Sequence, residues 1–146
     1  MIAIKNIVKG DTLLWYLLFL GGIFGGMAVL LSAWGAHGLE ELFIESPQDR
    51  FSFNYATNFQ LFHTLFLVSI VFYMIASKTR TLLLLISSVL LIFGIFLFSF
   101  PIYVRIFLGY SELSWLTPLG GICFFLAWSL ISFHSISKIL NDNLTR

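Results

Sequence analysis

The stretch TLLLLISSVLLIFGIFLFSF, residues 81–100, decides the fold of this chain. It is almost wholly apolar and holds no charged residue. A helix that crosses the hydrocarbon core of a membrane needs about 20 such residues. The stretch therefore predicts a transmembrane helix that begins at Thr81 and ends near Tyr103.

The composition of the whole chain agrees with this reading. Of its 146 residues, 59% are apolar and 10% are charged, and the mean hydropathy is +0.96. Soluble domains are about 45–50% apolar and about 25% charged, so lipid is the expected solvent. The length fits a single domain, residues 1–146. A net charge of +1 argues against a nucleic-acid partner, and a lone cysteine, Cys123, excludes an internal disulfide and a cysteine-based zinc site.

Three further stretches satisfy the same length rule, at about residues 13–36, 55–76 and 115–137. The connections at residues 78–80 and 109–112 are short, so consecutive spans run antiparallel. The longest connection, residues 37–54, carries Pro47 and several carboxylates. The sequence predicts an all-α integral membrane protein, a bundle of four transmembrane helices.

The basic residues indicate the orientation of these spans. One side of the predicted membrane carries Lys5, Lys9, Lys78, Arg80, Lys138 and Arg146. The other side carries only Arg50 and Arg105. Because short loops rich in Lys and Arg stay in the cytoplasm, we expect both termini to be cytoplasmic and the acidic connection to lie outside. The expected location is the inner (cytoplasmic) membrane, crossed several times.

Glycine pairs mark the expected helix-packing surfaces. The segment GGIFGG, residues 21–26, places Gly21 four residues before Gly25 and Gly22 four residues before Gly26. Glycines at this spacing let helices approach closely in lipid. One pair can pack inside the bundle and the other can form a homodimer face. Gly120 and Gly121 supply a second point of close approach in the last span.

A few polar residues fall inside the spans at a similar depth. At about 1.5 Å per residue, His63 lies roughly 22 Å and Gln60 roughly 27 Å from the cytoplasmic end of the second span. Gln60 and His63 share one helix face. We therefore predict a polar cluster in the outer third of the membrane, contributed by all four spans. Its expected members are His37, Gln60, His63, Ser99, Tyr103 and Thr117.

Several roles are open to these side chains. His63 can simply hydrogen-bond a neighbouring span, and His37 can cap a helix end between Gly35 and Gly38. Alternatively, the histidines can relay protons or bind haem or a metal, because imidazole titrates near neutrality and is a common ligand. They can also hydrogen-bond a quinone or a lipid headgroup. The sequence contains none of the serine-hydrolase, metalloprotease or phosphate-loop motifs, so we expect no enzyme, no catalytic residue, no metal and no cofactor.

Three short motifs resemble a known family. They are GAHGL at residues 35–39, ATNFQLFHTL at 56–65, and TPLGG at 117–121, and together they are similar to the domain-of-unknown-function 423 family, the YgdD-like small membrane proteins. The family's Gln-x-x-His falls on Gln60 and His63. The resemblance implies a four-helix membrane protein and supplies no activity.

One segment departs from the family pattern. The third helix of the family usually reads Phe-Ser-Gly-Ser-x-Tyr, whereas this chain reads FSFPIY at residues 98–103. A small Gly-Ser pair is thus replaced by Phe100 and Pro101. Proline removes a hydrogen-bond donor and can kink a helix, so a ligand or partner that sits there in relatives would fit differently.

These observations favour a small non-enzymatic membrane protein that is structural or accessory to a membrane complex. Its expected partners are the lipid bilayer and either further copies of itself or a larger complex. A transporter or channel for a small solute or protons is the first alternative, although the inner half of the spans is nearly all apolar. A quinone-, lipid- or haem-binding membrane protein is the second.

Overall fold

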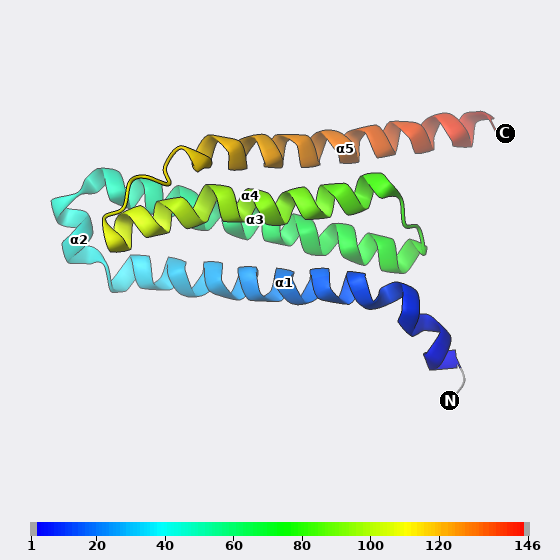
Figure 1. Cartoon of the computed structure of the whole chain (residues 1–146), viewed down its shortest axis with the longest axis horizontal. Coiled ribbons are helices and arrows are strands. Elements are labelled where there is room, and N and C mark those ends of the chain that lie inside the picture. Colours follow the sequence, from blue (N-terminus) through cyan, green and yellow to red (C-terminus); the bar gives the residue numbers. More distant parts are fainter. Residues whose placement is uncertain (1–2, 145–146) are drawn as a thin grey trace.

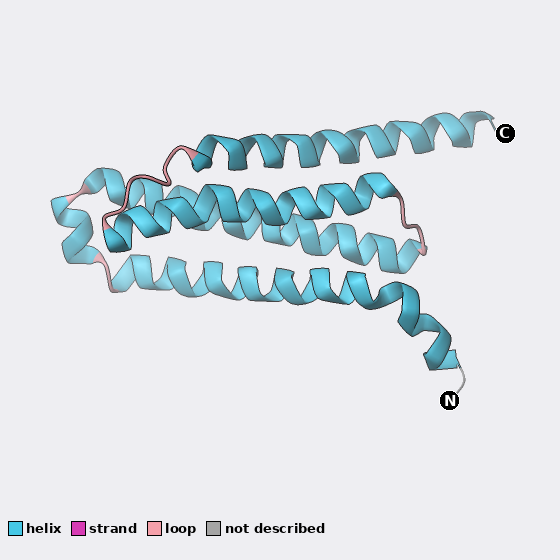
Figure 2. Ribbon diagram, viewed as in Figure 1, coloured by secondary structure: helices cyan, strands magenta, loops and turns pink. Residues whose placement is uncertain are grey.

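A computed structural model describes residues 3–144 of the protein, with side chains for residues 12–141, 143 and 144. The side chains of Lys5, Lys9 and Arg146, which contributed to the predicted orientation, lie outside the described part. The described chain forms only helices and connections (Figure 2). The helices are α1 (Ala3–His37), α2 (Glu40–Glu45), α3 (Pro47–Ser77), α4 (Leu82–Leu108) and α5 (Leu116–Leu144).

Four of these helices are long and apolar enough to cross a membrane. Their membrane-length segments are Thr12–His37, Pro47–Ser77, Leu82–Leu108 and Leu116–Asn141. The predicted all-helical fold with four membrane-length helices is therefore confirmed. α4 runs on through Pro101 to Leu108, so the proline does not end the helix.

The predicted connection at residues 37–54 is mostly helical. It contains α2 and the first turns of α3, which begins at Pro47 rather than near residue 55. Proline suits the first turn of a helix because its fixed φ is helical and its missing N–H needs no partner there. The helix begins before the predicted span, because the length rule detects only the apolar part of a helix.

The four long helices pack in chain order. α1 packs on α3, α3 on α4, and α4 on α5. Figure 1 shows α3 and α4 between α1 and α5, with both described chain ends at one end of the molecule and α2 at the other. We call these the termini end and the α2 end.

The α2 end is closed by aromatic packing and one ion pair. Phe43 of α2 is buried against the ring of Phe53 in α3, with ring centroids 5.6 Å apart. Arg105 near the end of α4 donates to the Asp49 carboxylate in the first turn of α3 at 2.7 Å. Each charge also lies at the helix end that its sign favours, an anion at an N-terminus and a cation at a C-terminus.

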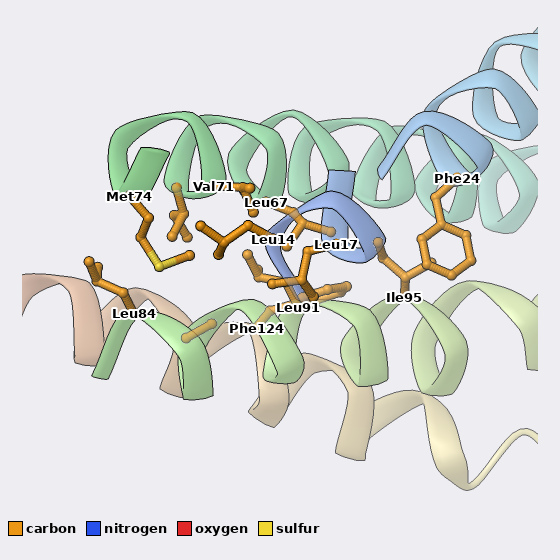
Figure 3. Packing of buried hydrophobic residues seen from close by; sticks show 12 residues of the cluster. Leu14, Leu17, Phe24, Leu67, Val71, Met74, Leu84, Leu91, Ile95 and Phe124 are labelled. Carbon is orange, nitrogen blue, oxygen red and sulfur yellow. The ribbon is translucent and has the colours of Figure 1, made fainter. Parts of the chain in front are cut away.

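Between the two ends, apolar side chains fill the space between the helices. Figure 3 shows Leu14 and Leu17 of α1 meeting Leu67 of α3 and Leu91 of α4, with Phe124 of α5 completing the cluster. Lipid tails are as apolar as these side chains, so the gain is close van der Waals contact rather than removal from water.

The glycines of α1 divide between two faces of that helix. A Cβ added at Gly21 would lie 2.7 Å from Cγ2 of Val68, and Gly25 also faces α3. A Cβ at Gly22 or Gly26 would meet nothing within 4 Å. The first pair thus lies in the α1–α3 interface, and the second pair faces outward.

The α4–α5 interface has a reciprocal arrangement. A Cβ at Gly120 of α5 would lie 2.5 Å from the backbone nitrogen of Phe98 in α4. Gly94 of α4 in turn lies against the ring of Phe124 in α5. A Cβ at Gly121 would meet nothing within 4 Å, so only one of the two adjacent glycines is required for contact.

We predict that Gly120→Ala destabilises the protein and that Gly121→Ala does not. The added methyl group at position 120 meets backbone, which cannot turn aside, and overpacking of this kind costs about 1–3 kcal/mol. The free energy of unfolding, measured by SDS titration of the protein in detergent micelles, tests the pair. Equal stabilities of the two variants would contradict the described α4–α5 contact.

Candidate functional site

Gln60 is the most deeply buried amide in the membrane-spanning part. Its side chain is 2% exposed. Its Nε2 donates to the carbonyl oxygen of Phe24 in α1 at 2.8 Å, and its Oε1 accepts from the hydroxyl of Tyr103 in α4 at 3.0 Å. One side chain therefore links α3 to both α1 and α4, and both ends of its amide are satisfied.

Ser99 belongs to the same site. It lies one turn before Tyr103 on α4, is 1% exposed, and donates to the carbonyl oxygen of Ala56 in α3 at 2.8 Å. We call Gln60, Ser99 and Tyr103 the polar cluster. It is smaller than the six-residue cluster expected from depth alone.

The space beside the polar cluster is small. A hollow of about 50 Å³ lies between α1 and α4, next to Gln60 and Tyr103, and is otherwise lined by apolar side chains. A water molecule occupies about 30 Å³ in the liquid. The hollow can hold a water molecule and is far below the usual size of a cofactor site, about 300–1,000 Å³.

His63 does not join the polar cluster. Its Nδ1 donates to the carbonyl oxygen of Phe59, one turn earlier on its own helix, at 2.7 Å. Its ring stacks on Phe124 of α5, with centroids 3.6 Å apart and planes 12° apart. Phe59 in turn stacks on Phe98 at 4.6 Å. His63 thus belongs to an aromatic stack of Phe59, His63, Phe98 and Phe124, which fills the space between α3, α4 and α5.

His37 and Thr117 also stand apart from the polar cluster. His37 is the exposed last residue of α1. Thr117 is half-buried in the first turn of α5, and its backbone N–H donates to the carbonyl of Ser114 at 3.2 Å. The depth count could not tell which way each helix turns its faces.

The two histidines cannot share one haem iron. Gly35, two residues before His37, packs against the ring of Phe53. His63 lies ten residues farther along α3, which is about 15 Å of helix. Across the described residues, no group of three or more His, Cys, Asp or Glu side chains is placed to hold a metal ion.

Ser87 was not among the predicted site residues, yet it joins α4 to α5. It is fully buried, and its hydroxyl donates to the carbonyl oxygen of Ala127 at 2.9 Å. Gln60 donates to a backbone carbonyl of α1 in the same way, and Ser99 donates to one of α3. Each pair of closely packed helices is thus joined by one side chain that donates to a backbone carbonyl of its neighbour.

His134, near the termini end of α5, also has a partner. Its ring is 6% exposed, and its Nδ1 lies 3.3 Å from the hydroxyl oxygen of Thr81. The same oxygen caps α4 by accepting the backbone N–H of Leu84 at 3.4 Å. Thr81 thus connects the start of α4 to α5.

One segment of the chain matches a family of known proteins. This segment contains the polar cluster, all three quoted motifs, and every member of the aromatic stack except Phe124. Residues 31–121, more than half of the chain, match the family model described as "Protein of unknown function (DUF423)". The chain belongs to the DUF423 family. The resemblance seen in the sequence is therefore confirmed.

Curated relatives of this DUF423 chain support the same assignment. It is 34% identical over 125 residues to the UPF0382 membrane protein YwdK of Bacillus subtilis, covering 84% of this chain and 97% of that protein. It is 32% identical over 114 residues to a UPF0382 membrane protein of Staphylococcus saprophyticus, covering 78% and 91% respectively. A Haemophilus influenzae relative is 29% identical over 114 residues, covering 78% and 88%. No solved structure matches the chain.

We predict that Tyr103→Phe destabilises this DUF423 protein much more when Gln60 is present than when Gln60 is replaced. The substitution leaves the buried Oε1 of Gln60 without a donor, and an unpaired buried polar group costs about 1–3 kcal/mol. In a Gln60→Leu background the same change should cost much less. SDS titration of the four proteins of this double-mutant cycle measures the difference.

The control is Tyr110→Phe, because Tyr110 is 60% exposed and should be insensitive to loss of its hydroxyl. If the losses at positions 60 and 103 are simply additive, the hydrogen bond between these two side chains does not stabilise the fold.

Proposed function

We propose that this protein is a non-enzymatic, multi-pass component of the bacterial cytoplasmic membrane that acts by packing against other membrane-embedded protein, either its own copies or a larger complex. The observation that carries this proposal is the filled interior. The buried amide of Gln60 is satisfied at both ends, and the neighbouring space is occupied by stacked rings.

Four of the five buried hydroxyls among the described residues support packing rather than passage; the hydroxyl of Thr64 has no partner. Ser87 and Ser99 donate across helix interfaces, whereas Thr57 and Ser88 donate to carbonyls of their own helices. A path for protons or solute needs polar groups free to exchange partners. These hydroxyls are instead bonded to backbone, which cannot move away without unwinding a helix.

The outward face of α1 is a suitable contact surface. Gly22 and Gly26 leave a shallow strip on it, flanked by the exposed side chains of Ile23 and Val29. Glycines at this spacing allow two helix backbones to approach closely in lipid. This strip is where we place the contact with a second copy or with a helix of a larger complex.

The proposed orientation has the termini end in the cytoplasm. Lys78, Arg80 and Lys138 lie at that end, and Arg105 at the α2 end is paired with Asp49. The excess of basic residues at the termini end favours a cytoplasmic position.

We predict opposite labelling at the two ends of the molecule in intact cells. In a Cys123→Ser background, a cysteine replacing the exposed Glu45 of α2 should react with a membrane-impermeant maleimide. A cysteine replacing the exposed Lys78 should react only after the membrane is permeabilised. Labelling of Lys78→Cys but not of Glu45→Cys in intact cells would reverse the proposed orientation.

The packing role predicts that another protein accompanies this one. We expect native mass spectrometry of the protein, extracted gently from its own membrane, to reveal a stoichiometric complex with itself or with one other membrane protein. Gly22→Leu/Gly26→Leu should abolish that complex, because two large side chains prevent backbone approach. Gly121→Leu, at an open position on α5, is the matched control.

A second measurement separates this role from transport. Purified protein in liposomes should leave the decay of a pH gradient unchanged, and His63→Ala should behave like the wild type. A protein-dependent leak that disappears in His63→Ala would overturn the proposed packing role.

A further inference from the structure

A groove lies between α3 and α5 at the termini end. It measures about 400 Å³ and is lined mainly by Phe66, Ile70, Tyr73, Ile131, His134 and Lys138. Tyr73 and Lys138 are exposed side chains, so the groove opens sideways toward lipid rather than into the interior.

The groove exists because the side chains between α3 and α5 are large rings toward one end and include short ones toward the other. Toward the α2 end, stacked rings fill the gap, and the last of these pairs is Phe66 on Trp128, with centroids 3.7 Å apart. Beyond that pair, the residues that face the gap include the short side chains of Ser69 and Ser135. The backbone of α5 lies close to α4, whereas its contacts with α3 are made by long side chains such as Phe66 and Trp128, so the gap stays open where the side chains are short.

One buried polar atom in the groove wall lacks a partner. His134 lines the groove, and its Nε2 has no hydrogen-bond partner among the described residues. The hydroxyl oxygen of Thr81 accepts from the backbone N–H of Leu84 and lies 3.3 Å from Nδ1 of His134. Nδ1 is therefore already paired, which leaves Nε2 as the ring nitrogen that can bond a ligand.

The groove is further defined by the charge of Lys138 and by the positions of its residues along α5. Thr81 is the N-cap of α4, so His134 lies level with the end of that span. Lys138 lies one turn beyond His134 on α5. Trp128 lies six residues before His134, about 9 Å along the helix, which is shorter than one leaflet of a hydrocarbon core about 30 Å thick.

We propose that this groove binds one anionic phospholipid of the surrounding leaflet. Its phosphate pairs with the Lys138 ammonium, an ester oxygen accepts from Nε2 of His134, and one acyl chain lies between α3 and α5 as far as the Phe66–Trp128 pair. Basic pockets between transmembrane helices on the cytoplasmic side are known to hold anionic lipid headgroups. Nε2 is covered in the wall, so a small turn of the exposed Tyr73 ring, 6.3 Å from the imidazole, accompanies binding.

The test is a lipid titration followed by native mass spectrometry. Delipidated full-length protein in detergent is mixed with phosphatidylglycerol or with phosphatidylcholine of the same acyl chains. We expect one phosphatidylglycerol per chain, bound more tightly than phosphatidylcholine. Lys138→Gln should weaken phosphatidylglycerol binding about fivefold, from the contribution of one lysine to an anionic headgroup, whereas Lys138→Arg should retain it. Lys78→Gln, at the same end but outside the groove, should have no effect.

A second pair of variants tests the groove itself. Ser135→Phe fills the groove from its exposed rim and should abolish binding. Ser132→Phe places the same ring on α5 outside the groove and should leave binding unchanged. Equal binding of the two lipids, equal loss in Lys78→Gln and Lys138→Gln, or equal loss in the two phenylalanine variants would overturn the proposal. So would a quinone or other neutral amphiphile that occupies the site in gently extracted protein and is lost in Ser135→Phe.

These outcomes do not depend on the proposed packing role. Lipid binding in detergent is measured on the isolated chain, and neither Gly22 nor Gly26 lies near the groove. The packing role and the lipid site can therefore each fail while the other stands.

Discussion

Backbone carbonyl oxygens that accept hydrogen bonds from neighbouring helices are the interaction on which this structure depends. In lipid, helices gain nothing by burying apolar surface from one another, so contact must come from close approach and from the few polar groups available. Gln60 reaches α1 from α3, Ser99 reaches α3 from α4, and Ser87 reaches α5 from α4. Glycines permit the same approach at the α1–α3 and α4–α5 interfaces.

The two ends of the molecule solve the packing problem differently. At the α2 end, aromatic rings, an ion pair and a short helix join the helices. At the termini end, short side chains leave a groove between α3 and α5, and the polar groups of Thr81, His134 and Lys138 lie beside it. The groove is where we propose that the chain holds a molecule of its solvent.

The sequence predicted the spans well because the rule behind them is simple. Uninterrupted apolar runs of membrane length are visible in residues 81–100 without knowledge of any neighbour. The inward position of Gln60 was also predictable, since an amide facing hydrocarbon is costly. Its partner was not predictable, because the carbonyl of Phe24 is a backbone group with no signature in the side chains.

The surroundings of His63 were also not predictable from the sequence. Depth and helix face both placed it near Gln60. Instead, its Nδ1 donates to a carbonyl of its own helix, and its ring stacks on Phe124. Aromatic neighbours on other helices determine where the His63 ring lies, and a single sequence does not reveal these neighbours. Ser87 was overlooked for a related reason, since a serine in an apolar run looks the same whether it bonds its own helix or the next.

The order in which the helices pack has a consequence for how the protein is made. Each long helix after α1 packs on the long helix that immediately precedes it in the chain. Contacts that are local along the chain cost little loop-closure entropy and form early. During synthesis, each long helix after the first therefore meets a packing partner that is already in the bilayer.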